Sequence, residues 1–196
     1  MPDGSGGSMS SASAEARRPT RPGGEAKSQP AGAGLLYLRE EEIRLAQDLL
    51  FFAYRDFTNA ADVILGELGL GRAHHRTLHF IGRNPGMTVS ELLGILKITK
   101  QSLARVLSAL VERGFVAQAP GADDRRQRLL TLTPAGQDLE RRLFERQRER
   151  LVAAYREAGP ASVEGFRRVM RGVMDQSARA YLENSARRRE PPARDA

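Results

Sequence analysis

The residues with the clearest chemistry lie on the polar side of a helix that the sequence predicts over 99–113. Glutamine can pair bidentately with adenine and arginine with guanine in the major groove of a DNA duplex. The N-terminus of such a helix also favours a nearby phosphate. The candidate base-reading residues are Gln101, Ser102 and Arg105, and the candidate phosphate-binding residues are Thr99 and Lys100. The alternative is that these residues form an ordinary solvated helix face.

A second group of candidates lies in a loop between two short segments that predict β-strands. The residues are Asp124, Arg125, Arg126 and Arg128. Arginines at a hairpin tip have no evident packing role, whereas a narrow minor groove attracts guanidinium groups. We expect Asp124 to hold a guanidinium in a fixed orientation, so that less entropy is lost when DNA binds. The alternative is a hairpin tip that is merely soluble.

The distribution of charge supports a polyanionic partner. The chain carries a formal net charge of +7, and residues 97–128 hold seven basic and three acidic residues, a net charge of +4. A concentrated basic surface of this kind favours DNA. A generally arginine-rich composition is the alternative explanation.

Local signals predict the elements that position these residues. Thr88 and Glu91 match a capping box, which begins a short helix over 88–96. Thr99 can cap the helix that follows, and Gly114 can end it in the left-handed conformation. Strands are predicted over 115–119 and 128–132, a helix from Thr133-Pro134 to about Ala158, a break at Gly159-Pro160, and a last helix over 161–184. The order is therefore helix, turn, helix and a β-hairpin wing.

The apolar pattern over residues 36–68 is wider than the stripe of a surface helix, which indicates burial on two sides, the second plausibly by another copy of the chain. The fold class predicted is mainly α, a winged helix-turn-helix with a two- to three-stranded wing and a helical dimerisation region. The expected parts are a disordered tail (1–34), an N-terminal dimerisation helix (35–70), the DNA-binding region (71–133), C-terminal dimerisation helices (134–184) and a basic tail (185–196).

These motifs resemble the MarR family of winged-helix regulators. The resemblance lies in Ala104-Arg105-Val106-Leu107 and in Asp124-x-Arg126 followed by Leu132-Thr133-x-x-Gly136, and it covers roughly residues 35–184. The stretch from His74 to Thr88 is also similar to the PetP-like branch of this family. The resemblance implies a homodimer, a palindromic double-stranded DNA operator and a small anionic or phenolic effector. It also implies that Arg126 enters the minor groove with Asp124 as its supporting acid.

Three histidines allow two further interpretations. His75 and His79 are one helical turn apart and could share a metal ion, with Asp62 as a third ligand, but two imidazoles alone do not complete a site. They also fall where the family places its effector pocket, so an effector close to them is the preferred hypothesis, and no metal is expected.

Other functional classes have little support in the sequence. The chain contains no cysteine, which excludes disulfides and thiolate metal sites. No Ser–His–acid arrangement or phosphate-binding glycine loop stands out, so we expect neither an enzyme nor a cofactor. No signal peptide or membrane span is evident, which favours a cytoplasmic protein. The expected function is transcriptional regulation by sequence-specific DNA binding; the alternatives are a winged-helix protein-interaction module and a metal-responsive regulator using the histidines.

Overall fold

The computed structural model describes residues 33–122 and 124–187. Its elements are η1 (Ala33–Leu38), α1 (Glu40–Glu67), α2 (Arg72–Arg83), β1 (Met87–Thr88), α3 (Val89–Leu96), α4 (Lys100–Glu112), β2 (Val116–Pro120), β3 (Arg128–Leu132), α5 (Pro134–Val173) and α6 (Gln176–Arg187). The predicted fold class, mainly helical with a small antiparallel sheet, is confirmed. In the described part of the chain, no helix combines the length and apolarity that crossing a membrane requires.

The chain divides into two units, residues 1–45 and 46–196, and α1 crosses the division. In the first unit, Arg44 forms an exposed ion pair with Glu40 one turn earlier, at 2.6 Å. The predicted disordered tail lies outside the described residues except for Ala33 and Gly34, which belong to η1.

The second unit contains the helix-turn-helix. The predicted capping box of α3 is confirmed: Thr88 Oγ1 accepts from the Glu91 N–H at 3.1 Å, and the Glu91 carboxylate accepts from the Thr88 N–H at 2.7 Å. α3 ends at Lys97, which adopts the left-handed conformation with φ 50°. Thr99 then caps α4, and Gly114, with φ 70°, follows its end as predicted.

The sheet has the order β1-β3-β2 and is antiparallel throughout. β3 has the predicted bounds, whereas β2 begins and ends one residue later than predicted. The two-residue β1, in which Met87 pairs with Leu130, was not predicted. It joins the start of α3 to β3 of the wing, which is the hairpin formed by β2 and β3.

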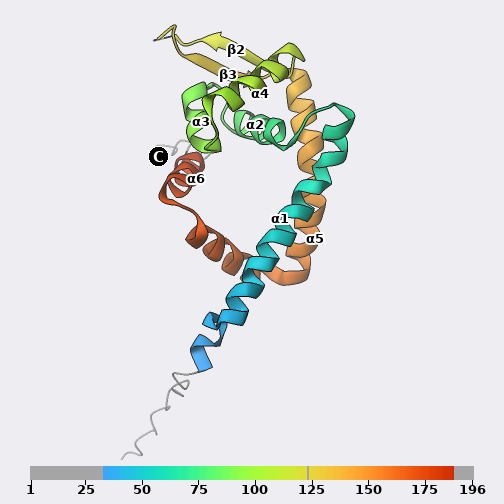
Figure 1. Ribbon diagram of the computed structural model, residues 1–196, viewed down its shortest axis with the longest axis vertical. Helices are drawn as coiled ribbons and strands as arrows, with labels where there is room; N and C mark the ends of the chain where they lie inside the picture. The colour runs from blue at the N-terminus through green and yellow to red at the C-terminus, as the bar shows by residue number, and fades with distance from the viewer. Residues whose placement is uncertain (1–32, 123, 188–196) are drawn as a thin grey trace, which may run out of the picture. The chain divides into compact units, whose positions relative to one another are not determined.

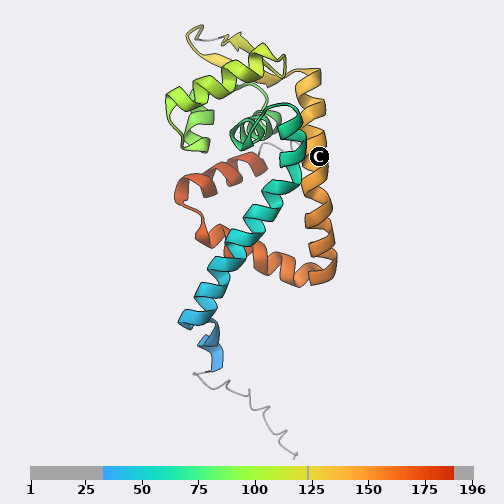
Figure 2. The same cartoon turned by 45° about the vertical axis from the view of Figure 1, so that its right-hand side comes forward.

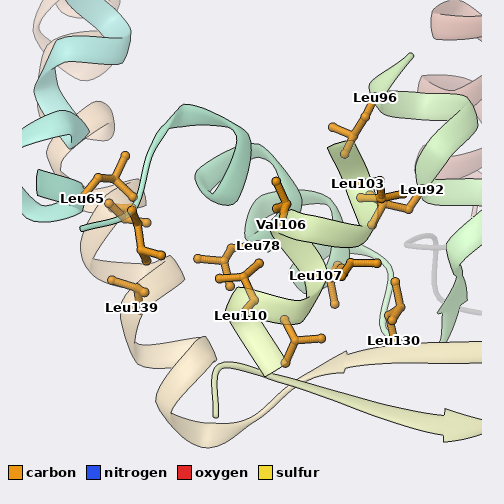
Figure 3. Packing of buried hydrophobic residues seen from close by; sticks show 14 of the residues in the cluster. Leu65, Leu78, Leu92, Leu96, Leu103, Val106, Leu107, Leu110, Leu130 and Leu139 are labelled. Carbon is orange, nitrogen blue, oxygen red and sulfur yellow. The ribbon is translucent and has the colours of Figure 1, made fainter. Parts of the chain in front are cut away.

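One apolar cluster joins these elements. The side chains of Leu78 in α2, Leu110 in α4 and Leu130 in β3 are completely buried, and Figure 3 shows them directed into the space between the helices and the sheet. Leu65 of α1 and Leu139 of α5 extend the cluster toward the two long helices. The helix-turn-helix and the wing are therefore held on one continuous core.

The C-terminal helices differ from the prediction. Gly159, with φ 76°, bends α5 just before Pro160 as expected, but the helix over 161–184 is in fact two helices. The segment after the bend ends at Val173, because Asp175 caps a new helix through the Ala178 N–H at 2.9 Å. α6 then continues to Arg187, three residues into the expected C-terminal tail, whose remainder lies outside the described residues. Figures 1 and 2 show α5 running beside the later part of α1, and α6 returning to lie against α3.

Candidate nucleic-acid interface

The start of α4 is fixed by side-chain hydrogen bonds. Thr99 Oγ1 accepts from the Ser102 N–H at 3.1 Å, and its hydroxyl donates to Ser102 Oγ at 2.9 Å. The Ser102 side chain is half-buried and takes part in this cap. Thr99 and Lys100, the predicted phosphate-binding residues, are both exposed at the helix N-terminus, where backbone N–H groups favour an anion.

The two faces of α4 have the predicted polarity. Leu103, Val106, Leu107 and Leu110 are buried, and Gln101, Arg105, Ser108 and Glu112 are exposed. Helical periodicity places Val111 with these apolar residues, but it is 38% exposed. No described carboxylate lies within ion-pair distance of Arg105. Gln101 and Arg105 therefore present amide and guanidinium groups to solvent on one surface.

The wing loop is shaped by backbone hydrogen bonds. The Gly121 N–H donates to the Gln127 carbonyl, and the Gln127 N–H donates to the Asp124 carbonyl, both at 3.0 Å. Gly121 is buried, and a Cβ there would lie 2.8 Å from the Asp124 carbonyl oxygen. The loop therefore closes tightly across its base.

Asp124 orients Arg126 differently from the expectation. Its Oδ1 accepts from the Arg126 backbone N–H at 2.9 Å, and the structure shows no ion pair between Asp124 and a described guanidinium. An aspartate readily bonds the N–H two residues later, because the turn brings that donor to its carboxylate. The acid thus orients the backbone at Arg126. The side chains of Arg125 and Arg126 in the loop are exposed, and so is that of Arg128, which the structure places at the start of β3.

The junction between the wing and α5 explains the spacing Thr133-x-x-Gly136. Thr133 Oγ1 accepts from the Gly136 N–H at 3.1 Å, and the Thr133 hydroxyl donates to the Gly114 carbonyl at 2.5 Å. Gly136 is buried, and a Cβ there would lie only 2.0 Å from the Phe115 carbonyl oxygen. The motif therefore joins the end of α4, the first strand of the wing and the start of α5. The close approach at Gly136 gave no local sequence signal, because the partner is 21 residues earlier in the chain.

A cleft of about 440 Å³ separates the start of α3 from the end of the wing loop and the start of β3. Thr88, Val89 and Ser90 line one side, and Arg126, Gln127 and Arg128 line the other. Ser90 is exposed beside the arginines and was not among the predicted site residues. The sequence could have indicated Ser90, because it lies in the first turn of a helix capped by Thr88, where phosphate contacts are favourable.

The histidines are engaged in separate local contacts. His74 Nδ1 accepts from the Gly71 N–H at 3.1 Å, and His79 Nδ1 lies 3.6 Å from Glu140 of α5. Burial lowers the pKa of His75 below its usual value, and the nearby imidazole of His79 lowers it further. His79 thus lies where α2 meets α5, and His75 is one helical turn before it in α2.

Asp62, the third ligand of the metal hypothesis, is already in an ion pair. Asp62 Oδ2 accepts from Arg72 Nη2 at 2.7 Å and from its Nε at 3.1 Å, so this carboxylate is already paired. In the regions that the structure describes, no three His, Asp or Glu side chains are grouped as a metal site would require.

The comparisons with known proteins agree with this geometry. A model of the MarR family matches residues 68–127. The HTH-type transcriptional regulator PetP of Rhodobacter capsulatus is 49% identical over 154 residues, which cover 79% of this chain and 93% of that regulator. A crystal structure of MarR superposes with a TM-score of 0.57 at 25% identity, covering 70% of this chain and 93% of the other. NadR in complex with 4-hydroxyphenylacetate gives a TM-score of 0.55 at 20% identity, covering 78% and 95%. At that identity the likeness to NadR concerns the fold.

Proposed function

Because the chain belongs to the MarR family and is a DNA-binding transcriptional regulator, we propose that it binds a palindromic operator as a homodimer. Each protomer places α4 in a major groove and its wing in the adjacent minor groove. The two-fold axis of the dimer then sets half-sites about one helical turn apart, roughly 34–36 Å.

The polar face of α4 beside the arginine-bearing wing is the observation that supports this function most directly. Gln101 and Arg105 are exposed near a capped helix start, where side chains can reach base edges. Each bidentate pairing with a base contributes about 1–3 kcal/mol of discrimination. Arg126 is exposed in the wing loop and its backbone N–H is bonded to Asp124, which suits insertion of its side chain into a narrow minor groove. Phosphate contacts supply most of the affinity, so binding weakens steeply with salt.

The dimer is supported by apolar side chains that this single chain leaves exposed. In the later part of α1, Leu49, Phe51 and Phe52 are 60%, 63% and 55% exposed. An apolar groove of about 550 Å³ runs between α1 and both segments of α5, and Phe57, Leu151 and Phe166 are among its lining residues. Apolar surface on this scale marks an interface in a protein that functions in water, and a second copy related by two-fold symmetry is the proposed occupant.

The effector is proposed to be a small anionic or phenolic molecule bound close to His75 and His79. NadR, whose structure contains 4-hydroxyphenylacetate, gives the chemical precedent. A ligand can shift DNA affinity only if it binds two conformations unequally. The junction of α2 with α5 can provide that difference, because it joins the helix-turn-helix to the long helices. We place this activity in the cytoplasm, where the DNA of a bacterial cell lies.

Selection of bound duplexes from a random pool tests the proposal. We expect a palindromic consensus, and a Gln101→Ala variant is expected to lose preference at one position in each half-site while retaining its affinity for random DNA. Arg126→Ala should weaken operator binding by about 1–3 kcal/mol without unfolding the protein. If no duplex sequence is enriched over random competitor, the chain is better explained as a protein-interaction module.

A further inference from the structure

α6 contacts the helix-turn-helix at the turn between its two helices. The ammonium of Lys97 forms an ion pair with the carboxylate of Asp175, at the start of α6. Lys97 ends α3 in the left-handed conformation, only two residues before Thr99, the cap of α4. The ion pair therefore acts on a residue of the turn that connects α3 to the helix proposed to read DNA.

The conformation of Lys97 makes this contact important. Among the described residues other than glycine, Lys97 alone has positive φ, at 50°. A side chain with a Cβ is strained there and keeps that conformation when its surroundings favour it. An ion pair that holds the Lys97 side chain contributes to that preference.

Asp175 combines two roles in one carboxylate. Its Oδ1 accepts from the Ala178 N–H at 2.9 Å and from the Ser177 hydroxyl at 2.7 Å, which begins α6. Its Oδ2 binds Lys97. Lys97, followed by the Ala178 N–H and the Ser177 hydroxyl, holds the pKa of Asp175 far below its usual range. The start of α6 and the turn of the helix-turn-helix are thus fixed at the same point.

A second polar contact holds α6 further along its length. Tyr181 Oη accepts from Asn84 Nδ2 at 2.8 Å, and the Tyr181 ring meets the Phe80 ring edge-on at 5.6 Å between centroids. Asn84 is buried at the end of α2, and its Nδ2 also donates to the Phe80 carbonyl. α6 is therefore tied to both α2 and α3.

Apolar packing between these two contacts is incomplete. A cavity of about 270 Å³ lies between α6 and the helix-turn-helix, with Ile95, Met174, Ala178 and Leu182 among its lining residues. Gly94 of α3 also lines it, and a Cβ there would meet no atom within 4 Å. Because close packing is incomplete here, the polar contacts contribute to holding α6 in place.

We propose that Asp175 and Tyr181 are positioning residues for DNA recognition. The contacts Asp175–Lys97 and Tyr181–Asn84, together called the α6 brace, hold the helix-turn-helix from α6. Asp175 acts through Lys97 on the direction of α4. The inference rests on the proposed sequence-specific DNA binding. An exposed ion pair contributes little to the free energy of unfolding, so loss of the brace alters sequence discrimination more than stability.

Asp175→Asn in the full-length protein is the first test. Asparagine caps a helix as well as aspartate does, so this change removes the charge and keeps the start of α6. We expect affinity for the selected operator to fall by roughly 3- to 10-fold relative to random duplex, with an unchanged urea midpoint. Tyr181→Phe, which removes only the hydroxyl, should lower the same ratio.

Asp138→Asn is the matched control. Asp138 forms an exposed ion pair with Arg141 on α5, so the variant makes the same change in net charge without contact to the helix-turn-helix. Any general gain in DNA affinity from removing an acid appears in both variants. The brace is refuted if the operator-to-random affinity ratio of Asp175→Asn equals or exceeds that of Asp138→Asn.

A double-mutant cycle tests the route through Lys97. In a Lys97→Gln background, Asp175→Asn should cause no further loss of discrimination, because the interaction is already absent. Independent, additive losses would contradict the proposed route. The parent protein separates the two hypotheses: without any operator preference the proposed function fails, whereas an intact preference that Asp175→Asn leaves unchanged refutes only the brace.

Discussion

Gly136→Ala tests how the wing is joined to α5. A Cβ at this position would lie 2.0 Å from the carbonyl oxygen of Phe115 and 2.9 Å from its carbonyl carbon. Both atoms belong to the backbone, so no change of rotamer relieves the overlap. The start of α5 must move away from the end of α4, and this movement also weakens the hydrogen bond from the Gly136 N–H to Thr133.

The expected change in the free energy of unfolding follows from three effects. Overpacking a close contact costs about 1–3 kcal/mol, and weakening a helix cap costs about 1 kcal/mol. Alanine in place of glycine within a helix stabilises the folded state by about 1 kcal/mol. The net expectation is a loss of about 1–3 kcal/mol in unfolding free energy, whereas helix propensity alone predicts a gain.

Urea unfolding followed by circular dichroism measures this difference. All variants must be compared at one protein concentration, because the apparent stability of the proposed dimer would depend on that concentration. Gly94→Ala in α3 is the control: its Cβ would meet no atom within 4 Å, so it should be neutral or stabilise by up to about 1 kcal/mol. A Gly136→Ala protein as stable as its parent would refute the account of the wing junction.

Three further predictions concern the cap, the wing and a buried imidazole. Thr99→Ala removes the cap of α4 and should cost about 1 kcal/mol in urea unfolding; an unchanged midpoint would contradict that role. Asp124→Ala should bind operator more weakly than Asp124→Asn in fluorescence anisotropy, since asparagine retains an acceptor for the Arg126 N–H and both remove the charge; equal affinities would show that this hydrogen bond is dispensable. Burial lowers the pKa of His75, so below about pH 6.5 the unfolded chain binds more protons than the folded chain. The contribution of neutral His75 to the free energy of unfolding is therefore complete above about pH 6.5, and it is lost as the pH falls through the lower pKa of the folded state. His75→Gln should flatten that decline in midpoints measured between pH 7.5 and 5, and a parent whose stability rises on acidification would contradict the assignment.

Features encoded within a few residues could be predicted from the sequence. Thr88 and Thr99 are caps because a hydroxyl reaches the N–H groups of the next turn, and both begin helices as expected. The break at Gly159 likewise needs only local conformational preferences. The polar and apolar faces of α4 follow from helical periodicity, apart from Val111, which is 38% exposed at the edge of the apolar face.

Features that depend on distant partners were missed. β1 has two residues, and only its pairing with β3, some 40 residues later, makes it a strand. No proline or glycine follows the helix end near Met174, since Gly172 lies within the last turn, and the cap formed by Asp175 marks the break. At the candidate DNA interface, exposure of Gln101 and Arg105 could be predicted, but the backbone contact of Asp124 could not, because guanidinium and amide donors compete for the same carboxylate.

The bend at Gly159 and the start of α6 fix the phase of the segment between them. Each residue of an α-helix advances the chain by about 1.5 Å and turns it by about 100°. One extra residue between Pro160 and Val173 would therefore rotate Asp175 away from Lys97, and removing one would rotate it in the opposite sense. This segment therefore functions as a spacer, whose number of residues sets the direction in which Asp175 faces Lys97.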